Sequence, residues 1–255
     1  HALLDGRSRR RLLLEWLGLY DALSEGIEPV CELPPPPFTD YARWLTTQDP
    51  ARSRSFFEAL LQGFAEPTPL PMARRTPDRT GGMPRHGALD WFLDETATEQ
   101  LARRAADWEV SIHNLIQGAW AVLLGRFAGE DDVVFGGVRA CRHSGPAGTD
   151  SMVGLLINTL PVRVRLPEAT PLPEWMQALH GQWRALRTHE TTPLTRIQAW
   201  SGMPAGQPLF DSVVMFENSQ LEEGLQALGG TWATRGFELS GTTAFPLVIA
   251  GFAGR

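Results

Sequence analysis

Four consecutive prolines at residues 34–37 constrain the fold of this chain more than any other segment. Each proline fixes one backbone angle and lacks the amide hydrogen that a helix interior or an inner strand requires. Neither a helix nor a central strand can therefore pass through these residues, and we expect a stiff, extended connector. The connector divides the chain into a short N-terminal part, residues 1–33, and a large part, residues 34–255.

Apolar residues on both sides of the connector recur at helical or strand spacing. In the short part, Leu12, Trp16 and Leu23 predict a helix that is capped by Ser8 and ends near Gly26. In the large part the pattern predicts, in chain order, a helix over 39–64, a loop over 66–87, a strand over 88–93, helices over 95–108 and 112–127, strands over 133–138 and 155–166, a helix over 172–187, and strands over 210–216, 232–239 and 245–252. This irregular succession predicts a mixed α/β fold with α+β layers.

Composition excludes several classes of protein. A net charge of −6 argues against nucleic-acid binding as a property of the whole domain. All 23 positively charged residues are arginine, so a Schiff-base lysine and a Walker-type phosphate loop are excluded. Cys31 and Cys141 are far apart and lack metal-binding spacing, so we expect no metal site, no disulfide framework and a cytoplasmic location. The sequence contains no apolar run long enough for a membrane span, and we expect no association with membranes.

The first six residues, HALLDG, place a histidine shortly before an Asp-Gly turn. A base with a pKa near neutral, held at a tight bend, suits acyl transfer. Asp5 lies among apolar residues, where an unpaired buried carboxylate would be costly, so it needs a partner. Alone, this short motif is weak, because it also fits an ordinary chain terminus.

Four further segments follow in a specific order: FTDYARW at 38–44, VGLLINTLPVR at 153–163, HETTPL at 189–194 and LFDSVVMFEN at 209–218. Together with HALLDG they resemble the motifs of condensation domains of nonribosomal peptide synthetases. Those motifs are HHxxxDG, YxDFAxW, (I/V)GxFxNTxxxR, HQxxPFE and LFDxxxxFEN. The resemblance extends over the whole chain.

The resemblance implies a chloramphenicol-acetyltransferase-like fold, in which two similar lobes enclose a tunnel with the HHxxxDG loop at its middle. Residues 1–33 would be the tail of the N-terminal lobe, and residues 34–255 would be most of the C-terminal lobe. We therefore expect a family domain truncated at both ends. The first histidine of its motif and its final strand and helix would be missing.

The resemblance also implies the reaction and its partners. Two substrates, held as thioesters on the phosphopantetheine arms of upstream and downstream peptidyl carrier domains, would be joined by an amide bond. An adenylation domain would be adjacent in the same synthetase, and the domain itself would bind no cofactor. The INTLP segment favours an L-configured donor and acceptor. Ester-forming, terminal or epimerization-type relatives are alternatives, as is a non-catalytic recruitment or interface domain. We expect the isolated fragment to be inactive.

Site residues follow from matching the motifs position by position. His1 matches the second motif histidine, which acts as general base or positions the amine. Asp5 would form a structural ion pair with an arginine of the large lobe. Arg142 occupies the matching position, and Arg139 is the alternative. Gly6 would let the backbone turn and could offer its N–H to the oxyanion of the tetrahedral intermediate.

Two further groups of polar residues have alternative interpretations. Asn158 and Thr159 would either contact substrate in the tunnel or bond only to neighbouring backbone. Arg9, Arg10 and Arg11 form a basic cluster in the sequence. Such a cluster is either a solvated face or a contact for a phosphopantetheine phosphate or an acidic carrier domain.

Overall fold

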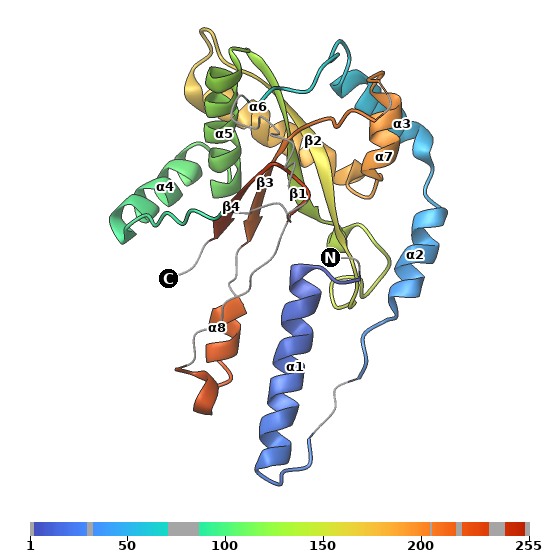
Figure 1. Cartoon of the computed structure of the whole chain (residues 1–255), viewed down its shortest axis with the longest axis vertical. Helices are drawn as coiled ribbons and strands as arrows, with labels where there is room; N and C mark the ends of the chain where they lie inside the picture. Colours follow the sequence, from blue (N-terminus) through green and yellow to red (C-terminus); the bar gives the residue numbers. More distant parts are fainter. Residues whose placement is uncertain are drawn as a thin grey trace, which may run out of the picture.

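The computed structural model describes residues 3–29, 33–70, 87–204, 206–217, 221–234 and 243–252. At its centre is a mixed four-stranded sheet in the order β2-β1-β3-β4 (Figure 1). β1 (Asp132–Ala140) pairs antiparallel with β2 (Ile157–Arg165) and parallel with β3 (Ser212–Glu217). β3 pairs parallel with β4 (Leu247–Phe252). The predicted mixed α/β architecture is confirmed.

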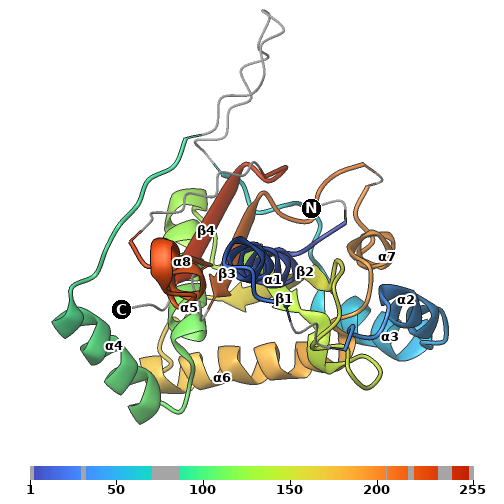
Figure 2. The same cartoon turned by 90° about the horizontal axis from the view of Figure 1, so that it is seen from below.

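Helices surround this sheet, and several of them pack against it to form the main apolar core. They are α2 (Phe38–Thr46), α3 (Pro50–Leu60), α4 (Glu95–Asp107), α5 (Ile112–Ala128), α6 (Leu172–Ala185) and α7 (Leu194–Trp200). The core unites side chains of α3, α5, α6 and α7 with those of the strands, and its largest fully buried members include Phe57, Phe135 and Phe210. Figure 2 shows α6 lying alongside the sheet, between α4 and the α2–α3 region. None of the helices in the described part of the chain has the length and hydrophobicity needed to cross a membrane.

The proline connector adopts the expected extended structure where it is described. Residues 33–37 contain neither helix nor strand, and Pro37, with φ −69° and ψ 142°, immediately precedes α2. Gly148, whose φ is +82°, accommodates the connector, because a Cβ there would lie 2.8 Å from Pro36 Cγ. Residues 30–32 lie outside the described residues.

α1 (Gly6–Ser24) projects away from the sheet (Figure 1). Its apolar residues Trp16 and Tyr20 are 66% and 60% exposed, so this helix stands outside the main core. α1 contacts α8 (Leu221–Gln226), and its outer part meets the 3-10 turn Gly230–Trp232. There Trp232 packs edge-on against Tyr20 and donates a hydrogen bond to Asp21.

Several predicted elements differ from the structure. The helix predicted over 39–64 is two helices, because Asp49 caps a new helix that begins at Pro50. The strand predicted over 88–93 is wrong: residues 87–94 form no helix or strand, and Trp91 is 84% exposed. An extended segment becomes a strand only when a neighbour pairs with its backbone. The strand predicted over 232–239 is replaced at its start by a 3-10 turn, and residues 235–242 lie outside the described residues.

Two short helices, α7 and α8, were not predicted, because each is too brief to produce a periodic apolar pattern.

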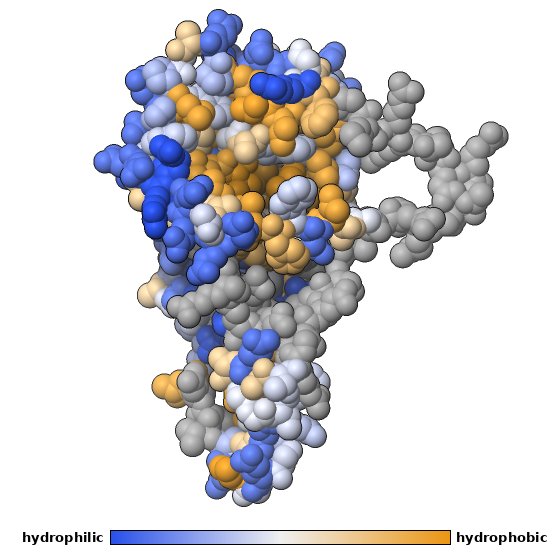
Figure 3. Space-filling model, turned by 90° about the vertical axis from the view of Figure 1, so that its left-hand side faces the viewer, coloured by the Kyte–Doolittle hydropathy of each residue, from blue (hydrophilic) through white to orange (hydrophobic). Residues whose placement is uncertain are grey.

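Figure 3 views the side of the molecule where β4 forms the edge of the sheet and shows an apolar area there. Leu247 and Phe252 of β4 are exposed by 38% and 53%. The exposed residues of this edge strand are therefore apolar.

The enclosed imidazole of His113 predicts a pH-dependent stability. His113 packs edge-on against Trp183 and stacks on Phe216. Burial, reinforced by the charge of Arg139, lowers its pKa from 6.5 to about 4. The unfolded chain therefore takes up a proton near pH 6.5, and the folded chain only near pH 4. As the pH is lowered from 6.5 to about 4, we expect the free energy of unfolding to fall by up to about 3 kcal/mol.

Urea denaturation at about pH 7 and about pH 4.5 would measure this loss. His113→Phe should remove the contribution, so the variant loses less stability than the wild type on acidification. The exposed His143 provides the control, and His143→Gln should keep the wild-type pH dependence. An unchanged pH dependence in His113→Phe would show that another group causes the effect.

Candidate functional site

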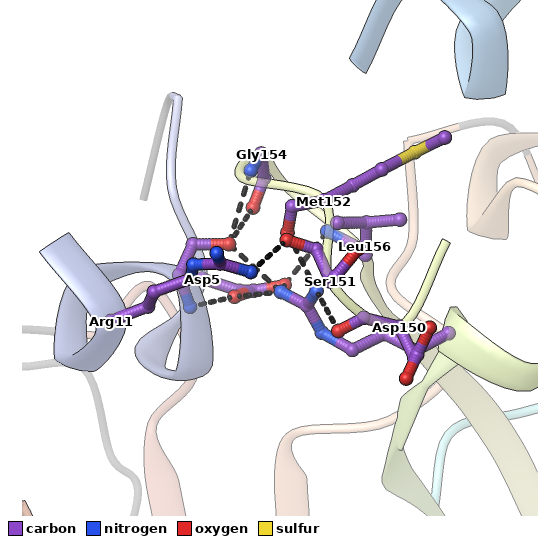
Figure 4. Close-up of polar contacts among 9 residues, drawn as sticks. Asp5, Arg11, Asp150, Ser151, Met152, Gly154 and Leu156 are labelled. Atoms are coloured by element: carbon purple, nitrogen blue, oxygen red, sulfur yellow. Dashed lines mark hydrogen bonds and ion pairs between the residues drawn. The ribbon is translucent and has the colours of Figure 1, made fainter. Parts of the chain in front are cut away.

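Asp5 lies at the centre of the candidate site, at the start of α1 (Figure 4). Its Oδ1 accepts the backbone N–H of Ser8 at 2.7 Å, so Asp5 and not Ser8 is the N-cap. A carboxylate suits this position because it satisfies a free N–H and opposes the positive end of the helix dipole. Oδ2 accepts the backbone N–H of Leu156 at 2.9 Å, and the N–H of Asp5 donates to the carbonyl of Gly154. The residue thus joins α1 to the segment that leads into β2.

Arg142 forms the ion pair with Asp5. Its Nη2 donates to Oδ1 at 2.7 Å and to Oδ2 at 2.9 Å, and it also donates to Ser8 Oγ at 2.8 Å. Nη1 donates to the carbonyls of Asp150 and Met152, which orients the guanidinium (Figure 4). The side chains of Asp5 and Arg142 are 0% and 2% exposed. This pair is therefore completely buried.

The environment of Asp5 keeps its carboxylate ionised. Burial alone would raise its pKa. The backbone N–H groups of Ser8 and Leu156, the Ser8 hydroxyl and the charge of Arg142 outweigh burial and hold the pKa below the usual 3.8. Both oxygens are engaged in hydrogen bonds, so Asp5 is suited to shaping the loop and unsuited to exchanging protons.

Ser8 and Gly154 complete this junction. Ser8 Oγ donates to the carbonyl of Gly154 at 2.8 Å and accepts its N–H at 3.0 Å. A Cβ on Gly154 would lie 2.2 Å from Cδ2 of Phe38, so only glycine lets the start of α2 approach so closely. The prediction of Ser8 as the helix cap is wrong. The aspartate three residues before Ser8 was a usable signal for the true cap, because aspartate is a preferred N-cap residue.

Arg139, the alternative partner of Asp5, belongs to a second ion pair. Its Nε donates to Glu190 Oε2 at 2.8 Å, and its Nη1 donates to the carbonyl of Trp183, whose ring lies 4.3 Å from the guanidinium. Glu190 Oε1 accepts the hydroxyl of Ser144 at 2.5 Å. Glu190 lies in the HETTPL segment, but the motif alone gave it no role, because nothing in the sequence places it beside the end of β1.

Asn158 connects β2 to the same network. Its Nδ2 donates to the carbonyls of Glu190 and Thr192 at 2.9 and 2.7 Å, and its Oδ1 accepts the N–H of Thr159. These hydrogen bonds all join Asn158 to backbone groups, as expected if the residue bonds only to neighbouring backbone. Contact of Asn158 or Thr159 with substrate stays a prediction.

The thiol of Cys141 is buried in this region and donates to the carbonyl of Glu190. Burial, with the charge of Glu190 adding to it, raises the pKa of this thiol to about 12. It is therefore protonated and unreactive at neutral pH. Cys31 lies outside the described residues.

The three arginines of the basic cluster point to different surroundings. Arg9 is exposed. Arg10 lies against α8, since a Cβ on Gly224 would be 2.5 Å from its Nη2. Arg11 donates to Glu15 and to the carbonyl of Ser151, both at 2.7 Å. Contact of these residues with a carrier domain or phosphopantetheine stays a prediction.

The remaining predicted site residues are His1 and Gly6. His1 lies outside the described residues, so its role stays a prediction. Gly6 is the first residue of α1, and a Cβ there would lie 3.4 Å from Glu217 Oε1. Among the described residues, no group of three or more His, Cys, Asp or Glu side chains could hold a metal ion.

Breaking the buried ion pair should destabilise the fold strongly. Arg142→Leu leaves Asp5 as a buried charge, and Asp5→Asn leaves Arg142 as one. We therefore expect each variant to lose about 3–5 kcal/mol of unfolding free energy. Denaturant titration of each variant at neutral pH would measure the loss. The exposed pair Arg103–Glu99 is the control, and Glu99→Gln should cost less than about 1 kcal/mol. Equal losses in buried and exposed pairs would contradict the assigned role of Asp5.

Solved structures with this architecture include condensation domains. The X-domain from teicoplanin biosynthesis aligns with a TM-score of 0.69 and 23% identity, over 85% of this chain and 50% of that one. The first condensation domain of the CDA synthetase aligns with a TM-score of 0.67 and 19% identity, over 86% and 48%. The predicted chloramphenicol-acetyltransferase-like fold is thereby confirmed. The chain spans about half the length of these solved structures.

Sequence comparison gives the same result at higher identity. A linear gramicidin synthase polypeptide of Brevibacillus parabrevis is 41% identical over 220 residues, which are 86% of this chain and 4% of that protein. Chondramide synthase of Chondromyces crocatus is 35% identical over 255 residues, 100% of this chain and 6% of the relative. The family model described as the condensation domain matches residues 1–252. The chain therefore belongs to the condensation-domain family of nonribosomal peptide synthetases.

Proposed function

We propose that this chain contributes to a site that forms an amide bond between two substrates held as thioesters on carrier domains. The observation that carries the proposal is the buried Asp5–Arg142 pair, which fixes the Asp-Gly turn of the HHxxxDG-like motif at the start of α1. A turn held by hydrogen bonds from Ser8, Leu156 and Arg142 is rigid enough to hold a catalytic group in place.

In the proposed reaction, the acceptor's α-amine attacks the carbonyl carbon of the donor thioester. The C–N bond forms, the C–S bond breaks, and the thiol of the donor's phosphopantetheine arm leaves with one proton from the nitrogen. His1 acts as the base or positions the amine, which typically contributes ~10²–10⁴-fold to the rate. Holding both tethered substrates in one tunnel supplies much of the remainder. Gly6 offers its N–H to the oxyanion.

The partners in this proposal are the upstream and downstream peptidyl carrier domains, and an adenylation domain in the same synthetase supplies the activated substrate. The short coverage of the curated relatives, 4% and 6% of their length, supports a role within a much larger assembly. The domain binds no cofactor of its own, and phosphopantetheine arrives on the carriers. The INTLP segment in β2 favours an L-donor and an L-acceptor, and a cytoplasmic location stays a prediction.

A non-catalytic role is the second candidate. The X-domain from teicoplanin biosynthesis, which shares the fold, has also been solved as a complex with OxyB. This chain would then act as an interface or recruitment domain. Amide formation by the complete polypeptide distinguishes the two candidates.

The first experiment tests His1. The complete polypeptide that contains this chain would be mixed with both loaded carriers, and the peptidyl-carrier product would be measured by mass spectrometry. We expect His1→Ala to lower the rate ~10²–10⁴-fold, because the positioned base is lost. His143→Gln removes an exposed histidine and should leave the rate unchanged. Equal rates for wild type and His1→Ala would exclude the assigned role.

A second experiment tests whether residues 1–255 suffice for catalysis. The chain spans about half the length of solved condensation domains, so we expect it alone to form no product. Co-expression with the rest of the complete polypeptide should restore turnover. A rate for residues 1–255 alone that equals that of the complemented pair would mean that the site lies within this chain.

A further inference from the structure

Glu217 lies against the Asp-Gly turn. It is the last residue of β3, and its Oε1 would be 3.4 Å from a Cβ on Gly6, the first residue of α1. β3 ends on the side of the sheet where α1 begins (Figure 1). The carboxylate of Glu217 therefore borders the turn that the Asp5–Arg142 pair holds in place. The proposed mechanism so far gives Glu217 no role.

Among the carboxylates near the turn, Glu217 differs in having no bonded partner in the part of the chain that the structure describes. Asp5 is paired with Arg142, and Glu190 with Arg139. Within the described residues, no hydrogen bond or ion pair forms to the Glu217 carboxylate. Glu217 is only partly buried and counts as an exposed residue of β3, so a ligand can reach it.

The surroundings of Glu217 favour a cationic ligand. The pKa of Glu217 is raised overall. Partial burial and the negative charge of Asp5 raise it, and together they outweigh the positive charge of Arg9, which lowers it. His113, which stacks on the neighbouring Phe216, contributes no positive charge at neutral pH because its own pKa is about 4. The exposed Arg9 is the cation that lowers the pKa. A bound ammonium group would supply both a countercharge and N–H donors.

The reaction proposed above brings such a group to this turn. The acceptor's α-amine has an ordinary pKa of about 7.7–8.0, so it arrives largely as an ammonium ion. Resting on the proposed function, we propose that the Glu217 carboxylate binds the α-ammonium group of the acceptor substrate beside Gly6 and so positions the reacting nitrogen. The ammonium then loses one proton to His1, and the neutral nitrogen attacks the thioester as described.

The test compares two acceptor molecules that differ in charge at one atom. One is the α-amino thioester substrate. The other is its α-hydroxy analogue, which is neutral, has nearly the same shape and serves as a competitive inhibitor. The complete polypeptide is used, with the donor loaded on its carrier. The KM of the amine and the inhibition constant of the hydroxy analogue are measured for wild type, Glu217→Gln, Glu217→Asp and the control Glu15→Gln.

We expect Glu217→Gln to raise the KM of the amine about tenfold or more, because a charge-assisted contact is lost. The inhibition constant of the hydroxy analogue should change less than about twofold, because it makes no such contact. Glu217→Asp keeps the charge at a longer distance and should show a smaller rise. Glu15→Gln removes one negative charge from the outer surface of α1, where Glu15 pairs with Arg11, and should change neither constant.

Equal weakening of both molecules in Glu217→Gln would overturn the inference, since Glu217 would then act only on the structure of the turn. An amine-specific loss reproduced by Arg9→Ala would also overturn it, because Glu217 would be acting through Arg9. If thermal unfolding shows that Glu217→Gln does not fold, the same comparison in Glu217→Asp decides. A wild-type polypeptide that forms no amide refutes the proposed function instead, so the two failures are distinguishable.

Discussion

The buried ion pair between Asp5 and Arg142 is the interaction on which the arrangement of this site depends. Taking two charges out of water is expensive, and their mutual attraction offsets that cost only when the remaining hydrogen-bonding groups are also satisfied. Here Ser8, Gly154 and Leu156 supply those hydrogen bonds. The same contacts fix the start of α1 against the segment entering β2. Removing one partner is costly because the other charge is left buried and unpaired, whereas the main effect of the intact pair is to fix the position of the turn.

A second buried pair, Arg139 with Glu190, organises the end of β1. Arg139 precedes Arg142 in the chain, and Cys141 lies between the two arginines. The side-chain carboxylate of Glu190 accepts hydrogen bonds from Arg139 and Ser144. Its backbone carbonyl accepts hydrogen bonds from Asn158 and Cys141. In this way hydrogen bonds and an ion pair connect the HETTPL segment to β1 and β2. The two networks place opposite charges next to each other in pairs and leave Glu217 without a bonded partner within the described residues.

This electrostatic arrangement links the fold to the proposed chemistry. Asp5 is held ionised and fully bonded, and His113 is held neutral by burial. Neither can exchange protons with a substrate near neutral pH. Among the described residues, Glu217 borders the turn with a carboxylate that has no bonded partner, and in the proposal Gly6 and His1 complete the reactive groups. In the proposed reaction the protein mainly orients two tethered substrates. It also binds the acceptor's amine and removes one proton from it.

The connector, the mixed α/β class, the order of most elements and the need of Asp5 for a buried partner could all be predicted from the amino-acid sequence. These follow from local chemistry: proline cannot continue a helix, apolar periodicity marks helices and strands, and a buried carboxylate requires compensation. The division at Pro50 was also present locally, in the Asp49-Pro50 pair that starts a helix. Motif matching favoured Arg142 as the partner of Asp5 and kept Arg139 as an alternative; packing settles the choice, because the 3-10 turn after β1 directs Arg142 inward and leaves Arg139 beside Glu190. Tertiary structure also decided that residues 88–93 are no strand and that Glu217 meets Gly6. Both depend on which distant segments become neighbours, and that is set by packing of the whole chain.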